Sequence, residues 1–288
     1  MGSRPGTEGL AGVTASRLFG LGFAAAMALA APAMAQQQRS PSDISQRAHD
    51  LSQAVANPIA HLISVPFQND LDFGIGRKNA VQNTLNVEPV VPIRLTNEWS
   101  VVTRTILPVI YHQSTFAGDR NEFGLGDTSF SAFFTRAGSA APGALMLGAG
   151  PMIRLPTATD NLLGNRRWAA GPTAIMVKQT QNWTVGVLAS HVWSFGDSAA
   201  RAGYSLTSFQ PFVVRQLGNG LSIGANLEAT YEWDTRAMAV PLNLRVSQIV
   251  RLGPLPVSIF AGPRVYLQRP SGGPDWGLRF GAQFLFPT

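Results

Sequence analysis

Apolar residues recur at every second position along most of the chain, starting near residue 63. In the segment 84–95, every odd-numbered residue is apolar or proline, whereas the even-numbered ones include Glu88 and Arg94. Successive side chains of a strand point to opposite faces, so a period of two predicts a strand. The alternation resumes over 99–112 after a short polar turn at 96–98. The pattern therefore predicts two long strands joined in a hairpin.

The same pattern predicts twelve strands, separated by segments rich in turn-forming residues. They span 65–75, 84–95, 99–112, 127–136, 144–156, 168–179, 183–195, 204–217, 221–233, 238–250, 256–268 and 276–286. Most are longer than the ~5–6 residues common in globular proteins. Short connections such as 96–98 and 180–182 alternate with longer ones such as 113–126 and 157–168. An even number of long strands, with turns at one end and loops at the other, is typical of outer-membrane barrels.

Several predicted strands contain proline, which has no N–H group to donate to a neighbouring strand. These prolines are Pro89, Pro92, Pro108, Pro151, Pro172, Pro211, Pro241 and Pro263. We expect bulges or kinks at such positions, because each proline removes one bond of the ladder.

Aromatic residues cluster at the ends of the predicted strands. Trp99 and Trp183 begin strands, and Tyr111, Trp193 and Trp233 end them. Rings at these positions suit the level of the lipid headgroups. A large soluble β-sandwich also alternates and is the competing architecture. Strand length and loop asymmetry favour an all-β fold over 63–288, an antiparallel transmembrane β-barrel of about 12 strands in the bacterial outer membrane.

The first 35 residues have the features of an export signal. Arg4 and Arg17 precede an uncharged run at 18–31, and Ala33 and Ala35 form an Ala-x-Ala site. The uncharged run is shorter than the ~18 residues that a spanning helix needs. We predict a cleaved secretory signal over 1–35, with a transmembrane anchor as the alternative.

Residues 36–62 form a separate N-terminal segment that contains a predicted short amphipathic helix. Ser42 or Asp43 is its predicted N-cap, and the pair Asn57-Pro58 its predicted end. Its apolar positions, at helical spacing, are Ile44, Ala48, Leu51 and Val55. The narrow apolar stripe leaves two possibilities open, a plug in the barrel mouth or a helix on a surface.

Composition excludes several classes of function. Cysteine is absent, which removes disulfides, thiolate chemistry and cysteine-based metal sites. The net charge is +6, but the basic residues are scattered singly as arginine along the strands, which argues against a nucleic-acid partner. The sequence has no histidine-rich metal spacing. We therefore predict no cofactor and no metal.

Charged residues on the face opposite the apolar one predict a polar lumen. A charge that faces lipid at the midplane costs ~2–4 kcal/mol, whereas the same charge costs little in a wet interior. Parity assigns to the inner face Asp70, Asp72, Glu88, Arg94, Arg104, Asp127, Arg154, Arg215, Glu228, Glu232, Arg245, Arg264 and Arg279. The candidate lumen-lining residues among them are Glu88, Arg104, Arg154, Glu228, Glu232, Arg245, Arg264 and Arg279. Ion pairs that brace the wall and a charged lining that screens solutes are two compatible interpretations.

An enzyme is the competing class of function, because a lipid hydrolase can work on the outer wall of a barrel. Such catalysis needs a histidine within hydrogen-bond reach of a serine, with a third polar group that orients the ring. Of the histidines, only His112 and His191 fall in predicted strands. His191 shares the face of Trp183 and Val185, so we interpret it as an interfacial polar residue and predict no enzyme. A serine near His191 Nε2 would favour the hydrolase instead.

Five separated motifs occur in the order of a known family. They are NPIAHLISVPFQNDLDFGIG, VVTRTILPVIYH, FGLGDTSF, LPTATDNLLG and GGPDWGLRFGAQFLFP. Together they resemble a family of bacterial outer-membrane proteins labelled MetA pathway of phenol degradation, or simply transporter, over about residues 56–287. The resemblance implies a channel or transporter for small, often aromatic or hydrophobic, solutes, with outer-membrane lipids around it. A structural barrel with a closed lumen is the alternative, and the oligomeric state is left open.

Overall fold

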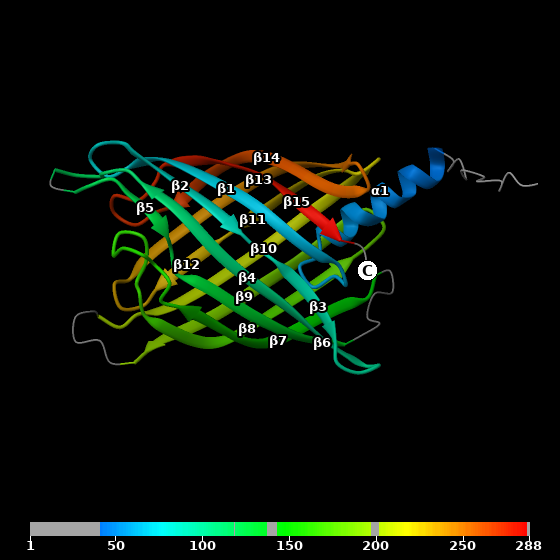
Figure 1. The fold of residues 1–288 in the computed structure, drawn as a ribbon, viewed down its shortest axis with the longest axis horizontal. Coiled ribbons are helices and arrows are strands. Elements are labelled where there is room, and N and C mark those ends of the chain that lie inside the picture. The colour runs from blue at the N-terminus through cyan, green and yellow to red at the C-terminus, as the bar shows by residue number, and fades with distance from the viewer. Residues whose placement is uncertain (1–40, 118, 137–142, 197–201, 287–288) are drawn as a thin grey trace, which may run out of the picture. The chain divides into compact units, whose positions relative to one another are not determined.

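The computed structural model describes residues 41–117, 119–136, 143–196 and 202–286, with side chains from residue 45. The predicted secretory signal at 1–35 lies outside these residues. The described chain forms a closed antiparallel β-barrel preceded by one helix, α1 (Pro41–Val55), as Figure 1 shows. None of its described helical segments is both long and apolar enough to cross a membrane.

The barrel is built from strand segments that follow one another around the wall in chain order. The segments are β1 (Ile63–Ile75), β2 (Ala80–Val87), β3 (Val90–Arg94), β4 (Trp99–His112), β5 (Glu122–Leu125), β6 (Thr128–Arg136), β7 (Leu145–Leu155), β8 (Trp168–Gln179), β9 (Trp183–Phe195), β10 (Ser205–Gly218), β11 (Leu221–Leu227), β12 (Ala229–Glu232), β13 (Ala237–Leu252), β14 (Leu255–Gln268) and β15 (Trp276–Phe286). Three pairs of segments continue each other, namely β2 with β3, β5 with β6 and β11 with β12. The described residues therefore form 12 barrel strands, which confirms the predicted fold class.

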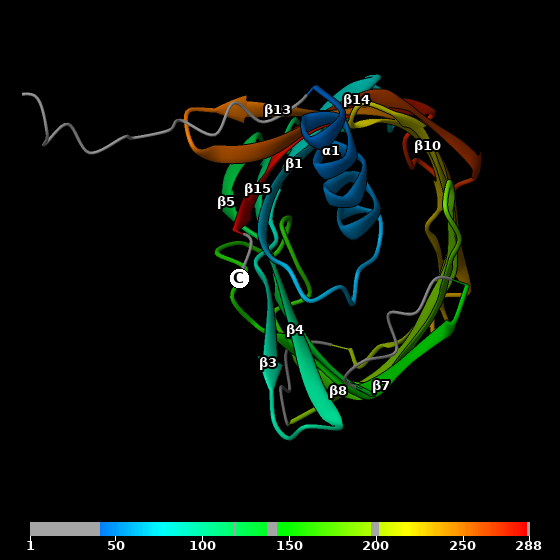
Figure 2. The ribbon, with the colours of Figure 1, turned by 90° about the vertical axis from the view of Figure 1, so that its right-hand side faces the viewer.

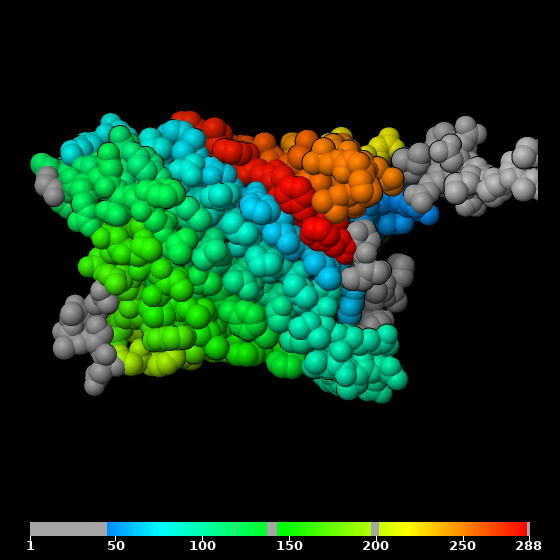
Figure 3. Space-filling model, viewed as in Figure 1, coloured from blue at the N-terminus to red at the C-terminus, as the bar shows by residue number. Residues whose placement is uncertain are grey.

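The first and last strands close the barrel. β1 pairs antiparallel with β15, in a register that runs from Ile63 opposite Phe286 to Phe73 opposite Trp276. The strands have the alternation of exposed and buried side chains that the sequence predicts. On β9, for example, Trp183 and Trp193 are exposed whereas Leu188 is buried. The strands form a continuous outer wall on the face seen in Figure 3.

The two ends of the barrel differ in their connections. One end, here called the turn end, carries α1 and the short turns 95–98, 180–182, 219–220 and 253–254. Asn219 and Gly220 both have positive φ, as a two-residue hairpin turn that matches the strand twist requires. The opposite end, the loop end, carries the loops 113–121, 156–167 and 269–275, together with short turns at 76–79 and 233–236. In outer-membrane barrels the turn end faces the periplasm.

Prolines of neighbouring strands account for the three breaks within barrel strands. The backbone N–H of Glu88 donates to Pro66 O, that of Gly126 to Pro108 O, and that of Glu228 to Pro241 O, each over 2.9 Å. Proline has no N–H to complete the reciprocal bond, so the ladder is interrupted opposite each one. Pro108 and Pro241 were among the prolines for which the sequence predicted a bulge. Two of the breaks occur at Glu88 and Glu228, and both of these acids line the lumen.

An apolar cluster fills part of the lumen towards the turn end. Ile59, in the segment after α1, packs against buried side chains of β4, β6, β7, β8 and β9. These side chains are Val102, Phe133, Met146, Ile175, Val177 and Leu188. The sequence predicted a polar lumen, and the structure shows that this apolar cluster occupies one side of it.

Two of the sequence-based predictions are wrong. Arg215 was assigned to the inner face, but its side chain is exposed and its guanidinium lies 5.3 Å from the ring of Trp183 on the outer wall. Near the headgroups an arginine can keep its charge in water while its stem covers apolar surface, so the cost at the midplane does not apply. The helix begins at Pro41, which places Ser42 and Asp43 inside α1 and not at its cap.

Candidate functional site

A group of buried charges lies in the lumen, and Arg279 is at its centre. Arg279 on β15 lies directly opposite Asp70 on β1 in the strand register. Its Nε and Nη2 donate to the two carboxylate oxygens of Asp70 over 2.6 and 2.8 Å. A two-pronged contact of this kind fixes the orientation of both groups and is among the strongest polar contacts in proteins. Arg279 is 5% exposed and Asp70 6%.

Glu228 is the second carboxylate that contacts the guanidinium of Arg279. Nη1 and Nη2 of Arg279 donate to Glu228 over 2.6 and 2.9 Å, and Nη1 of Arg264 donates to the same carboxylate over 3.0 Å. Arg264 Nε also lies 3.4 Å from Asp72. We call Asp70, Asp72, Glu228, Arg264 and Arg279 the charge cluster. Its members come from β1, β14, β15 and the break between β11 and β12, so the charge cluster ties these parts of the wall together.

Neutral side chains add hydrogen bonds to the charge cluster. Asn226 donates to Glu228 over 3.0 Å, and Asn243 accepts from Arg264 over 3.0 Å. Removing ions from water costs several kcal/mol each, and only close pairing with further hydrogen bonds offsets this. Arg279, Asp70 and Glu228 meet that requirement, whereas Asp72 Oδ1 has only its ion-pair contact with Arg264 among the described residues. The cluster is therefore suited to bracing the wall, which is one of the two interpretations of the charges made from the sequence.

A second ion pair lies apart from the charge cluster. Arg104 Nη2 on β4 donates to Glu88 over 2.7 Å. Glu88 occupies the break between β2 and β3, and it is buried. The pair lines the same space as Glu228 and Arg279, so the polar side of the lumen reaches from β4 to β15.

The remaining candidate residues take different places. Arg245 lies on β13 beside Phe260 and lines the lumen near Arg279. Arg154 on β7 lies 6.0 Å from the ring centre of Tyr204, away from the charge cluster. Glu232 accepts the backbone N–H groups of Ser205, Asp234 and Thr235 and so caps the turn at 233–236. Arg154 and Glu232 line neither of the lumen cavities described below.

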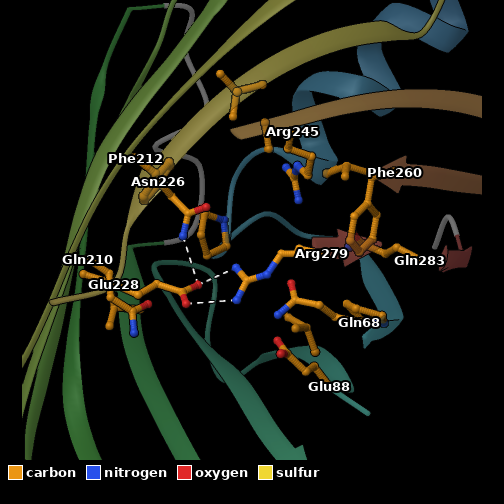
Figure 4. A pocket seen from close by; sticks show the side chains of 18 of the residues that line it. Gln68, Glu88, Gln210, Phe212, Asn226, Glu228, Arg245, Phe260, Arg279 and Gln283 are labelled. Carbon is orange, nitrogen blue, oxygen red and sulfur yellow. Dashed lines mark hydrogen bonds and ion pairs between the residues drawn. The ribbon is translucent and has the colours of Figure 1, made fainter. Parts of the chain in front are cut away.

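Two cavities lie in the lumen on either side of Glu228. The inner cavity, nearer the turn end, has a volume of about 180 Å³, and Figure 4 shows its polar lining. The outer cavity, nearer the loop end, has a volume of about 360 Å³ and is lined by Asp72, Arg264 and Tyr266 among others. Gln210 and Glu228 line both. The charge cluster thus forms the partition between the two spaces.

Several residues of the inner cavity were missed in the sequence analysis. They are the amides Gln68, Gln210, Asn226 and Gln283 and the rings Phe212 and Phe260. A signal for some of them was present, because Gln68 shares the parity of Asp70 on β1 and Gln283 that of Arg279 on β15. Only charged residues had been assigned to the lumen, so uncharged neighbours on the same face were not predicted.

The N-terminal segment reaches the inner cavity from the turn end. The ring of His49 lies 2.9 Å from Gln181 O, and Gln53 Nε2 donates to Thr180 O over 2.8 Å, so α1 is held by the turn at 180–182. Figure 2 shows α1 across the opening of the barrel. Val55, Ala56 and Pro58 form one wall of the inner cavity. These contacts place the segment inside the barrel mouth.

His191 on the outer wall has the serine contact that the hydrolase alternative requires. Its Nε2 lies 3.2 Å from Ser205 Oγ, and its Nδ1 lies 2.7 Å from Thr207 Oγ1. Trp233 Nε1 donates to the same threonine oxygen over 2.8 Å. An acyl-transfer site also needs donors for the developing oxyanion. The backbone N–H of Ser205 is already donated to the carboxylate of Glu232, whose negative charge would oppose an oxyanion there.

Comparison with known proteins agrees with the fold. No protein-family model matches the chain, and no curated protein matches it. Among solved structures, it is similar to the COG4313 outer membrane channel from Pseudomonas putida F1, with a TM-score of 0.59 and 16% identity over 78% of this chain and 94% of that one. It is also similar to the calcium-bound outer membrane phospholipase dimer of Salmonella typhi, with a TM-score of 0.45 and 12% identity over 82% of this chain and 98% of that one. The first likeness confirms the β-barrel fold. The exposed apolar side chains of the outer wall suit a lipid bilayer, which agrees with the predicted outer-membrane location.

Proposed function

We propose that the protein is an outer-membrane channel or transporter for small aromatic or hydrophobic solutes. The observation that carries this proposal is the pair of lumen cavities that share Gln210 and Glu228 and lie in line along the barrel. A barrel of 12 strands is wider than the eight-stranded kind that side chains fill, and narrower than open porins of ~16–18 strands. A constricted path is the expected result, and the charge cluster is the constriction.

The lining supports solutes that combine an apolar ring with a polar group. The inner cavity is lined by amides and charged groups together with two rings, Phe212 and Phe260, which lie on opposite sides of it. The apolar cluster around Ile59 lies next to the cavity. Arginine pairs with carboxylates and stacks on rings, so it suits such solutes better than bare ions. This class of solute is the one that the sequence resemblance to the phenol-degradation family implies.

Uptake into liposomes tests the proposal. We expect proteoliposomes with the wild-type protein to admit phenol and benzoate faster than protein-free liposomes. Arg104→Met removes a cation from the inner cavity and should change the rate for benzoate at least several-fold, while phenol is affected less. Arg215→Met is the matched control, because Arg215 lies on the outer wall, and its uptake should equal that of wild type. If neither wild type nor a variant without residues 41–62 shows uptake, the channel proposal is wrong. The protein is then a structural barrel with a closed lumen.

A lipid hydrolase is the second candidate function, and the contact between Ser205 and His191 is the observation that favours it. Because the backbone N–H of Ser205 already donates to the carboxylate of Glu232, we expect no release of fatty acid from phospholipid in mixed micelles, with or without calcium. Ser205→Ala is the matched variant. Release by wild type that this variant abolishes would establish the hydrolase.

A further inference from the structure

Arg245 differs from the other lumen arginines in its pairing. Arg104, Arg264 and Arg279 each form an ion pair with an acid. Within the part of the chain that the structure describes, Arg245 has no carboxylate within ion-pair distance. Its contact is with the ring of Phe260, whose centre lies 5.3 Å from the guanidinium carbon. Arg245 is only partly exposed and lines the inner cavity.

The distribution of charge around the lumen is uneven. The charge cluster combines the three acids Asp70, Asp72 and Glu228 with two arginines. Arg104 and Glu88 form a closed pair. The charge cluster therefore has one more negative than positive charge, and Arg245 brings the sum for the lumen to zero. Among the described residues, however, no acid lies within ion-pair distance of Arg245. A partly buried charge without a counter-ion is costly, and a bound anion offsets that cost.

The groups around Arg245 fit an anion that also carries a ring. Figure 4 shows Arg245 and Phe260 on one side of the inner cavity and Phe212 on the other, with Gln68, Asn226 and Gln283 nearby. A planar guanidinium binds a carboxylate through two parallel hydrogen bonds. The cavity volume of about 180 Å³ is close to that of an engineered cavity of ~150 Å³ that holds benzene. The amides provide donors for a second polar substituent.

We propose that the inner cavity is a binding site for a small aromatic carboxylate, with the carboxylate on Arg245 and the ring between Phe212 and Phe260. This inference rests on the proposed function, because it names the solute class that the channel would select. The site lies between the N-terminal segment and the charge cluster, so a solute would stop there before or after it passes the constriction. The binding itself does not require that the barrel conducts.

Equilibrium dialysis of labelled benzoate against the purified mature protein in detergent tests the site. We expect saturable binding by wild type and a loss of at least about tenfold in affinity for Arg245→Met, because a hydrogen-bonded charge contact is removed. Arg215→Met is the matched control and should bind as wild type does. Benzyl alcohol has the ring without the carboxylate, so its binding should be weak and unaffected by Arg245→Met. Phe212→Ala should weaken benzoate and leave acetate unchanged.

Thermal unfolding of the same samples separates binding from folding. Arg245→Met removes an unpaired charge, so it should fold and unfold at a temperature no lower than wild type, and benzoate should stabilise wild type alone. The site is wrong if wild type shows no saturable binding, or if Arg245→Met binds benzoate equally well. Either result leaves the liposome uptake of phenol untouched. Conversely, absent uptake together with intact binding rejects the channel and keeps the site.

Discussion

Replacing Arg279 by methionine will lower the free energy of unfolding by about 3–5 kcal/mol, the cost of breaking a buried ion pair by removing one partner. Arg279 is the group that holds both Asp70 and Glu228, through four hydrogen bonds of 2.6–2.9 Å. Without it, Asp70 keeps only Arg264 at 3.7 Å, beyond hydrogen-bond distance. The seam between β1 and β15 then has a buried carboxylate with no close partner. Guanidinium chloride unfolding in detergent, followed by circular dichroism, measures the loss.

Two further variants serve as controls for the Arg279→Met measurement. The triple variant Asp70→Asn, Glu228→Gln, Arg279→Met removes the charges together and should recover most of the loss, because no buried ion is left unpaired. Arg215→Met changes an exposed arginine on the outer wall and should shift stability by less than about 0.5 kcal/mol. If Arg279→Met unfolds as wild type does, the charge cluster does not brace the wall, and its charges serve solutes alone.

The strands could be predicted from the sequence because each has one face in lipid. Alternation with a period of two is the direct consequence, and all twelve predicted strands occur in the described structure. Two strands begin four and five residues earlier than predicted, at Ala80 in place of 84 and at Glu122 in place of 127. At the second of these the strand is interrupted after Leu125, before Thr128, so the alternation is reset there. The bulge lies beside Pro108 of a different strand, which no local pattern reveals.

The lumen was harder to predict, because the inner face does not have one character. On β8, Ala169, Ile175 and Val177 are buried towards the interior although the outer face is also apolar. When both faces of a strand are apolar, composition alone cannot show which face points into the lumen. The pairing of charges depends on register between distant segments, as with Asp70 and Arg279, which are 209 residues apart. Parity predicted that Arg279 and Glu228 share the interior, but it could not predict that they touch.

The position of the N-terminal segment could not be predicted from the sequence either. Periodicity predicted α1 and its end at Asn57, and α1 ends at Val55. The choice between a plug and a surface helix depends on the partner of the apolar residues. That partner is the cluster around Ile59, formed by five strands that lie far along the chain. Since nothing near residue 59 encodes this cluster, the sequence left the choice open.

Removing residues 41–62 will raise the single-channel conductance several-fold in planar bilayers. The segment lies across the opening at the turn end, and Val55, Ala56 and Pro58 wall the inner cavity, so its removal opens that cavity to the periplasmic side. The barrel should still close, because β1 begins at Ile63 and its register with β15 starts there. Gln53→Ala is the milder matched variant, since it removes the donors to the carbonyls of Thr180 and Gln181 and leaves the segment in place. We expect brief openings to the larger conductance for Gln53→Ala and a steady large conductance for the deletion. Equal conductance in all three proteins would place the limiting constriction at the charge cluster and show that the segment is not the plug.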